Sequence, residues 1–163
     1  MDILEELQHE LASEYEITKK FIAHYPEELN AWRPHEKSGT MLWLAIHVVE
    51  IFAWPYAIMN TPYLDFAVTP YAQPPLKTRE ELRKKLDADY QLGAETLGAL
   101  KPEELDGNWD IRMGEKVFMK WSKYGAIRHA LNQITHHRAQ LGVYYRLNNV
   151  YVPASYGPSA DER

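Results

Sequence analysis

Residues 41–54 read MLWLAIHVVEIFAW and form the longest apolar stretch of the chain. His47 and Glu50 interrupt this stretch, which is too short to span a bilayer. A buried core helix explains it better, and we expect that helix to run from about residue 40 to residue 60 and to be the most buried of the fold. Pro55 lies inside it and is expected to kink the helix or to end it early.

Three further segments have the apolar spacing of helices, at about residues 2–24, 78–100 and 122–147. Thr78 and Glu81 have the spacing of a capping box at the start of the second of these. The connection at 61–77 is rich in proline and cannot be a regular helix. A short hairpin around Gly114 is predicted between residues 109 and 121. Four helices with two long connections predict an all-α fold, a single domain over residues 1–163 built as a four-helix bundle with long crossover connections.

The composition of the chain limits the chemistry that it can support. The 163 residues include 18 Lys and Arg against 23 Asp and Glu, a net charge of −5, which disfavours nucleic acid as a partner. No cysteine is present, so disulfides, thiolate nucleophiles and cysteine-bound zinc are excluded. Histidine is therefore the strongest soft-metal ligand available. The first residues lack the pattern of a targeting segment, so a cytoplasmic protein without membrane partners is expected.

The last predicted helix contains RHALNQITHHRAQLGVYYR at residues 128–146. His129, Gln133 and His137 are spaced by four and share a face, beside a stripe of apolar residues. Polar groups on the edge of a buried face need partners, and a metal ion is one partner that suits imidazole. His47, on the most apolar helix, is the nearest candidate ligand from another helix. By spacing alone, hydrogen-bonded core histidines are the commoner alternative, and a structural ion pair is the commoner role for Arg138.

Three segments together resemble the DinB family, the DinB/YfiT-like metal-dependent proteins. They are TMLWLAIHVVEI at 40–51, IRHALNQITHHRAQLGVYYRL at 127–147 and VPASYGPSADE at 152–162. The resemblance runs over essentially the whole chain. It implies a four-helix bundle of crossover topology that is commonly dimeric. It also implies a divalent metal held by three histidines, one on the second helix and two spaced HxxxH on the fourth.

By this resemblance His47 matches the first ligand and His137 the last, whereas the middle position holds Gln133. An amide oxygen is a harder and usually weaker ligand than imidazole, so affinity for Zn²⁺ or Ni²⁺, the two favoured ions, should fall. Three outcomes are open: Gln133 coordinates through its oxygen, His129 or His136 replaces it, or the site is vacant. We expect a weakened or partly hydrated site at His47, Gln133 and His137, with doubtful occupancy.

Two functions from different classes remain open. The resemblance implies a metal-dependent enzyme, either a thiol-dependent S-transferase or a hydrolase acting on a small electrophile. Its catalytic residues are not identified, with Glu50 and His136 as candidate bases. The alternative is a non-catalytic, stress-related binding protein, a homodimer with a degenerate metal site and room for a small molecule. The family name suggests regulation by DNA damage, but the charge of −5 gives no physical support for DNA contact.

Overall fold

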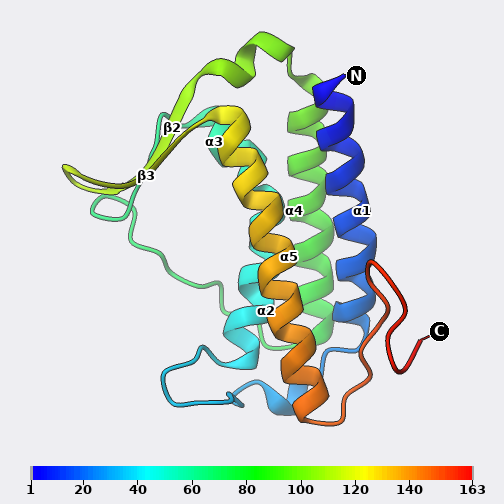
Figure 1. Cartoon of the computed structure of the whole chain (residues 1–163). Helices are drawn as coiled ribbons and strands as arrows, with labels where there is room; N and C mark the ends of the chain where they lie inside the picture. The colour runs from blue at the N-terminus through cyan, green and yellow to red at the C-terminus, as the bar shows by residue number, and fades with distance from the viewer. Residues whose placement is uncertain (1, 163) are drawn as a thin grey trace.

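The computed structural model describes residues 2–162 and is mostly helical. Figure 1 shows the long helices lying side by side, with the strands projecting to one side of them. The helices of this part of the chain are α1 (Ile3–Ala23), α2 (Met41–Glu50), α3 (Trp54–Asn60), α4 (Arg79–Ala99) and α5 (Lys123–Leu147), and its strands are β1 (Leu64–Asp65), β2 (Asn108–Met113) and β3 (Lys116–Ser122).

Each long helix begins at a side chain that caps it. The Asp2 carboxylate accepts a hydrogen bond from the Leu4 N–H at the start of α1. Thr78 and Glu81 form both halves of the predicted capping box at the start of α4. The Ser122 hydroxyl accepts from the Gly125 N–H at the start of α5. Such caps satisfy backbone donors that the first turn of a helix leaves unpaired. The predicted ends of these three helices are confirmed to within one or two residues.

The apolar segment is divided in the way that its proline predicts. α2 ends at Glu50, a 3₁₀ turn covers Ile51–Ala53, and α3 begins at Trp54 with Pro55 in its first turn. The stretch Met41–Asn60 is long and apolar enough to cross a membrane by length and composition, since an 18-residue part of it has a mean hydropathy of 1.6. However, 56% of that 18-residue part is buried inside the fold, where α2 and α3 pack against α4 and α5. The segment is therefore packed as a core helix.

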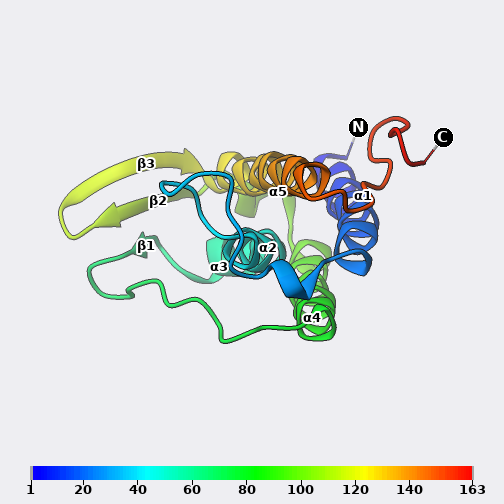
Figure 2. The ribbon, with the colours of Figure 1, turned by 90° about the horizontal axis from the view of Figure 1, so that it is seen from below.

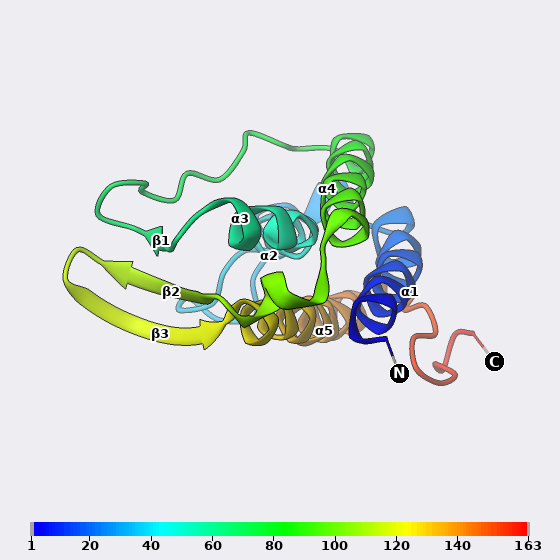
Figure 3. The ribbon, with the colours of Figure 1, turned by 90° about the horizontal axis from the view of Figure 1, so that it is seen from above.

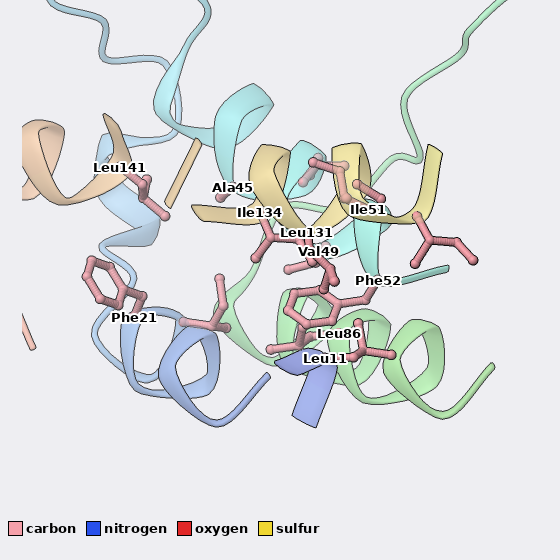
Figure 4. Close-up of a cluster of buried hydrophobic side chains, with 14 of the residues drawn as sticks. Leu11, Phe21, Ala45, Val49, Ile51, Phe52, Leu86, Leu131, Ile134 and Leu141 are labelled. Carbon is pink, nitrogen blue, oxygen red and sulfur yellow. The ribbon is translucent and has the colours of Figure 1, made fainter. Parts of the chain in front are cut away.

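The hydrophobic core lies between α1, α2, α4 and α5. Figure 4 shows Leu11, Phe52, Leu86 and Leu131, one from each side of the core, pointing toward one another. The 3₁₀ turn after α2 approaches α4 so closely that a Cβ added at Gly93 would lie 2.2 Å from the Phe52 carbonyl oxygen. Glycine is therefore the residue that lets these two segments touch.

The order of the helices in space explains the two long connections. In Figure 1, α1 and α5 run in one direction and α2 and α4 in the other. α1 packs on α4 and α5, and α2 packs on the same two helices. Figure 3, from above, shows these helices clustered and the strands extending from one side of the cluster. The connections between α1 and α2 and between α3 and α4 must therefore pass along the ends and flanks of the helices.

A small mixed sheet corrects the all-α prediction. β2 and β3 form the predicted antiparallel hairpin, and Gly114 turns it with a φ of 59° that favours glycine. β1, from the proline-rich connection, pairs parallel with β2, so the strand order is β1-β2-β3. The Asp65 carboxylate accepts from the Gly114 N–H at 2.9 Å and ties this connection to the hairpin. A strand of two residues has no alternation for the sequence to display, so β1 could not be predicted.

The segment after α5 returns along the helices without regular secondary structure. Asn149, with a φ of 55°, ends the helix. Arg146 then pairs with Asp161 at 2.7 Å, and Lys20 of α1 pairs with Glu162 at 3.2 Å. Figure 1 shows this final segment beside α1. The segment is a looped chain fixed to α1 and α5 by these ion pairs.

Candidate metal centre

α2 carries His47 at the boundary of the core. Leu44 and Ile51, one turn away on each side, are buried, and His47 itself is half-buried. Its ring stacks on Trp43, with ring centres 5.2 Å apart and an interplanar angle of 24°. Its two ring nitrogens make no hydrogen bond with any described residue. His47 is therefore a largely desolvated imidazole with a free nitrogen lone pair.

α5 carries a row of polar side chains on the face next to α2. His137 Nε2 lies 2.9 Å from Gln133 Oε1, and His137 Nδ1 lies 2.9 Å from Gln140 Oε1. The spacing of these residues along the helix is four and three, so they share one face. Gln133 and His137 of the predicted row are joined by a hydrogen-bond contact and Gln140 extends it, whereas His129 is not connected to them.

The two helices bring His47 and His137 together. Their ring centres lie 4.7 Å apart, with the rings near perpendicular at 70°. These residues are far apart in the sequence and meet because α2 packs against α5 along this face. Two imidazoles bound to one Zn²⁺ at the usual bond length have ring centres roughly 5 Å apart. The predicted candidates His47, Gln133 and His137 thus form one cluster.

Both ring nitrogens of His137 face amide oxygens, which restricts its protonation. A neutral imidazole has one N–H, so it can donate to Gln133 or to Gln140, but not to both. If Nδ1 donates to Gln140, the lone pair of Nε2 faces Gln133 Oε1, and two acceptors oppose each other. A second proton on His137, a rotated Gln133 amide or a shared cation would resolve this conflict.

Burial argues against the second proton. It lowers the pKa of His137 below its ordinary value, an effect reinforced by the neighbouring His136 and partly offset by the contact with Gln140. Burial, together with His137, lowers the pKa of His47 to about 4. Both imidazoles are therefore neutral near pH 7, the form that a metal ion requires. The remaining resolutions are a cation or a rotated amide.

His129 and His136, the two histidines that could replace Gln133 as a ligand, lie on different sides of this cluster. His136 is exposed, and its ring centre is 4.8 Å from that of His137. His129 packs against Trp121 of β3, with ring centres 4.7 Å apart, and lies 6.5 Å from Trp54. Burial lowers the pKa of His129. His129 is thus occupied with the aromatic side chains at the base of the hairpin, whereas His136 borders the cluster.

Glu50 points toward α4 and the proline-rich connection. Tyr71 donates to Glu50 Oε2 at 2.6 Å. Burial raises the pKa of Glu50, an effect that the bond from Tyr71 and the charge of Lys85 oppose. Tyr71 was not identified from the sequence, because it reaches Glu50 from an irregular segment whose path no local pattern reveals. Because Tyr71 donates to the Glu50 carboxylate, Glu50 is not a freely solvated base.

Arg138 has the structural role that was expected of it. The guanidinium is 2% exposed, and its Nη2 lies 2.5 Å from Oε2 of buried Glu14 and 2.9 Å from the Tyr156 hydroxyl. Tyr156 in turn donates to the other oxygen of Glu14 at 2.6 Å. The ion pair joins α1, α5 and the C-terminal segment. Arg138 is therefore not available to bind a substrate.

The donors at the cluster fit a weakly held metal ion. Within residues 2–162, no group of three or more His, Cys, Asp or Glu side chains is placed to hold one. The cluster instead offers two neutral imidazoles and one amide oxygen. The separation of 2.9 Å between His137 Nε2 and Gln133 Oε1 is a hydrogen-bond distance, somewhat shorter than the roughly 3.3 Å between two ligand atoms on a tetrahedral Zn²⁺, so a small movement of the Gln133 side chain would let both bind one ion. Gln140 would fix the tautomer of His137 from the other side, as partners of metal-bound histidines usually do.

Known structures share this arrangement of helices. A DinB-like protein from Bacillus subtilis aligns with a TM-score of 0.68 and 16% identity over 97% of this chain and 99% of that one. A protein from Exiguobacterium sibiricum, provisionally assigned to the DinB family, aligns with a TM-score of 0.69 and 21% identity over 91% of this chain and 93% of the other. A DinB-like protein from Bacillus cereus gives a TM-score of 0.69 at 16% identity, over 93% and 97% of the two chains. The chain has the DinB-like fold.

The likeness to these proteins is one of structure. No protein-family model matches the chain, and no curated protein matches its sequence at a significant level. The identities of 16–21% establish a DinB-like fold rather than a shared activity. The function of this DinB-like chain therefore has to be argued from its own residues.

Proposed function

We propose that this DinB-like chain is a four-helix bundle of the DinB family that binds one divalent cation, Zn²⁺ or Ni²⁺, at His47, His137 and Gln133. The likeness to three DinB-like structures supports the family, and the juxtaposed donors support the site. We further propose that the cation serves a reaction in which a low-molecular-weight thiol, or water, attacks a small electrophile. Because the chain has no cysteine, the thiol must enter as a second substrate.

One observation carries this proposal: the neutral imidazole of His137 faces Gln133 Oε1 at 2.9 Å while a second imidazole, that of His47, lies beside it without a hydrogen-bond partner among the described residues. Buried polar groups are normally partnered. A cation shared by the three groups provides a partner for each of them and removes the conflict between two acceptors.

The residues of the chain have distinct roles in this proposal. A bound divalent cation would act as a Lewis acid that lowers the pKa of a thiol or a water. In the His137 tautomer that metal binding at Nε2 requires, Gln140 would accept from Nδ1 and keep the Nε2 lone pair directed to the site. Trp43 covers one face of the His47 ring and keeps water from it. Exposed His136 is favoured over Glu50 as the base, because its ring centre lies 4.8 Å from that of His137.

A thiol-conjugation assay tests the activity. Purified protein is stripped with a chelator, reloaded with Zn²⁺ or Ni²⁺, and supplied with a small thiol and the electrophile monochlorobimane. We expect conjugation above the uncatalysed rate in the loaded protein, with a loss of about 10²-fold in His47→Ala, since two ligands hold metal poorly. His9→Ala, on the exposed side of α1, is the matched control and should retain the activity. Equal rates in loaded, stripped and His47→Ala protein would refute the proposal.

A second candidate function is a non-catalytic, homodimeric binding protein with a degenerate site. It is favoured by the alternative in which the Gln133 amide is rotated, because His137 is then fully hydrogen-bonded by Gln133 and Gln140 without a metal. In that case His47→Leu should be at least as stable as the parent, because it replaces a buried polar group by an apolar one. Marked destabilisation, matched in the parent by chelator treatment, would exclude this candidate.

A further inference from the structure

A pocket of about 380 Å³ opens at the start of α2, next to the candidate metal centre. It forms where the connection between α1 and α2 passes beside α2, a path that Figure 2 shows from below. The proline-rich connection contributes one residue from the other side. Pockets that bind small molecules have volumes of about 300–1,000 Å³. The lining residues are Arg33, Ser38, Gly39, Thr40, Trp43 and Gln73.

Trp43 connects this pocket with the metal centre. Its indole lines the pocket and also stacks on His47. Gly39 lies so close to the indole that an added Cβ would be 2.7 Å from it, and Gln73 donates to the Trp43 carbonyl at 2.9 Å. The Trp43 side chain is 38% exposed although its backbone is held from both connections. A ligand in the pocket would therefore contact the aromatic wall that borders His47.

Arg33 is the one charged side chain among the described residues that line the pocket. Its Nη1 donates to the Glu36 carbonyl at 3.1 Å, and its other N–H groups bond to no described residue. Arg33 is exposed, and in an acidic chain an arginine with unpaired donors beside an open pocket favours an anionic ligand.

The backbone of α2 adds no donors for that anion. The Met41 N–H is taken by the Trp32 carbonyl, the Leu42 N–H by the Asn30 carbonyl, and the Trp43 N–H by the Thr40 hydroxyl. A phosphate dianion generally requires more positive charge than one guanidinium supplies. A singly charged carboxylate, which pairs with arginine through two parallel hydrogen bonds, matches the pocket better.

We propose that this pocket is the subsite for the carboxylate of a small ligand, with Arg33 as its ion-pair partner and Trp43 as the wall shared with His47. The other end of the ligand is assigned from the proposed function: it is a thiol, whose sulfur would bind the cation. The thiol substrate is then an anionic thiol. Ser38 and Gln73 are the other side chains with polar groups, besides Thr40, that line this pocket.

The test uses mercaptocarboxylates of two to six carbons, each paired with the mercaptoalcohol of equal length. In metal-free protein, ¹⁵N-resolved NMR follows the Trp43 indole and the Arg33 side chain during titration. We expect at least one carboxylate to bind about ten-fold more tightly than its alcohol, with shifts at both residues. Arg33→Gln should remove this preference and leave binding of the alcohol unchanged. Lys37→Gln, on the same connection but outside the pocket, should keep the preference.

The same pairs are then titrated into Co²⁺-loaded protein, in which a sulfur-to-cobalt charge-transfer band reports thiol binding to the metal. Carboxylate selection that depends on Arg33 in metal-free protein, with no cobalt band, would support the pocket and refute the proposed metal function. A cobalt band with equal affinity for acids and alcohols at every length would support the metal function and overturn the pocket. Loss of preference in Lys37→Gln as well as in Arg33→Gln would also overturn it, because the effect would then be one of general charge.

Discussion

Gln133 occupies the position at which a histidine would complete a three-histidine site. The resemblance to the DinB family implied that His47 and His137 would share a site, and α2 and α5 do bring them together, with 4.7 Å between ring centres. The sequence could not predict Arg33 at the neighbouring pocket, because that position depends on a connection without a periodic pattern. Trp43 against His47, in contrast, is an i,i+4 pair within α2 that helical spacing could have revealed. Local spacing thus placed Gln133 and His137 on one helix face, whereas the approach of His47 and the neighbouring pocket depend on tertiary packing.

The depressed pKa of His47 predicts a loss of stability in acid. The pKa is about 4 in the folded chain against 6.5 for an ordinary histidine. Above pH 6.5, His47 is neutral in both the folded and the unfolded chain. Between pH 6.5 and pH 4, His47 binds a proton in the unfolded chain but not in the folded chain, so the stability falls as the pH falls. His47→Leu should show a smaller decline in melting temperature between pH 7 and pH 5 in chelator-treated protein. An identical decline in both proteins would contradict the assignment.

The buried ion pair between Arg138 and Glu14 should be sensitive to loss of one partner. Arg138→Met leaves the Glu14 carboxylate buried without its cation, which should cost about 3–5 kcal/mol in urea unfolding. Adding Glu14→Leu to that variant should restore much of the stability, because no charge then remains buried. Tyr156→Phe should cost less, about 1 kcal/mol, through its hydrogen bond to Glu14. A double variant no more stable than Arg138→Met would show that the pair does not act as a unit.

At the scale of elements, capping side chains and prolines predicted most helix boundaries. Thr78 with Glu81, and Pro55 inside the apolar segment, each mark a boundary that the structure confirms. The hairpin at Gly114 was predicted from its turn, but β1 was not, because its two residues pair with β2 only through a contact distant in sequence. The all-α prediction holds for the helices and is corrected by the small sheet that β1 and the hairpin form.

The contact between α4 and the turn after α2 gives a prediction with an internal control. Gly93→Ala would place a methyl group 2.2 Å from the Phe52 carbonyl oxygen, so the segments must separate at a cost of about 1–3 kcal/mol. Gly98, on the same helix, has nothing within 4 Å of an added Cβ, so Gly98→Ala should stabilise the protein by about 0.5–1 kcal/mol. Chemical denaturation measures both, and similar effects of the two substitutions would contradict the close packing.

At the scale of the whole molecule, we propose a homodimer, as the resemblance to the DinB family implies. Light scattering coupled to size exclusion should give about twice the monomer mass of 19.0 kDa. The Arg33 pocket and the histidine cluster are built within one chain, so activity should not require the dimer. A species of 19.0 kDa at micromolar concentration would refute the dimer without affecting the metal site.

The central claim is that His47, His137 and Gln133 hold one divalent ion, and equilibrium competition for Zn²⁺ against a chromogenic chelator tests it most directly. We predict about one Zn²⁺ per wild-type chain and no specific binding in His47→Ala. Gln133→His should bind at least about ten-fold more tightly, a gain of about 1.4 kcal/mol, because imidazole is the better ligand for zinc. A wild-type chain that takes up no ion at saturating zinc, or a Gln133→His variant that binds no better, would contradict the account.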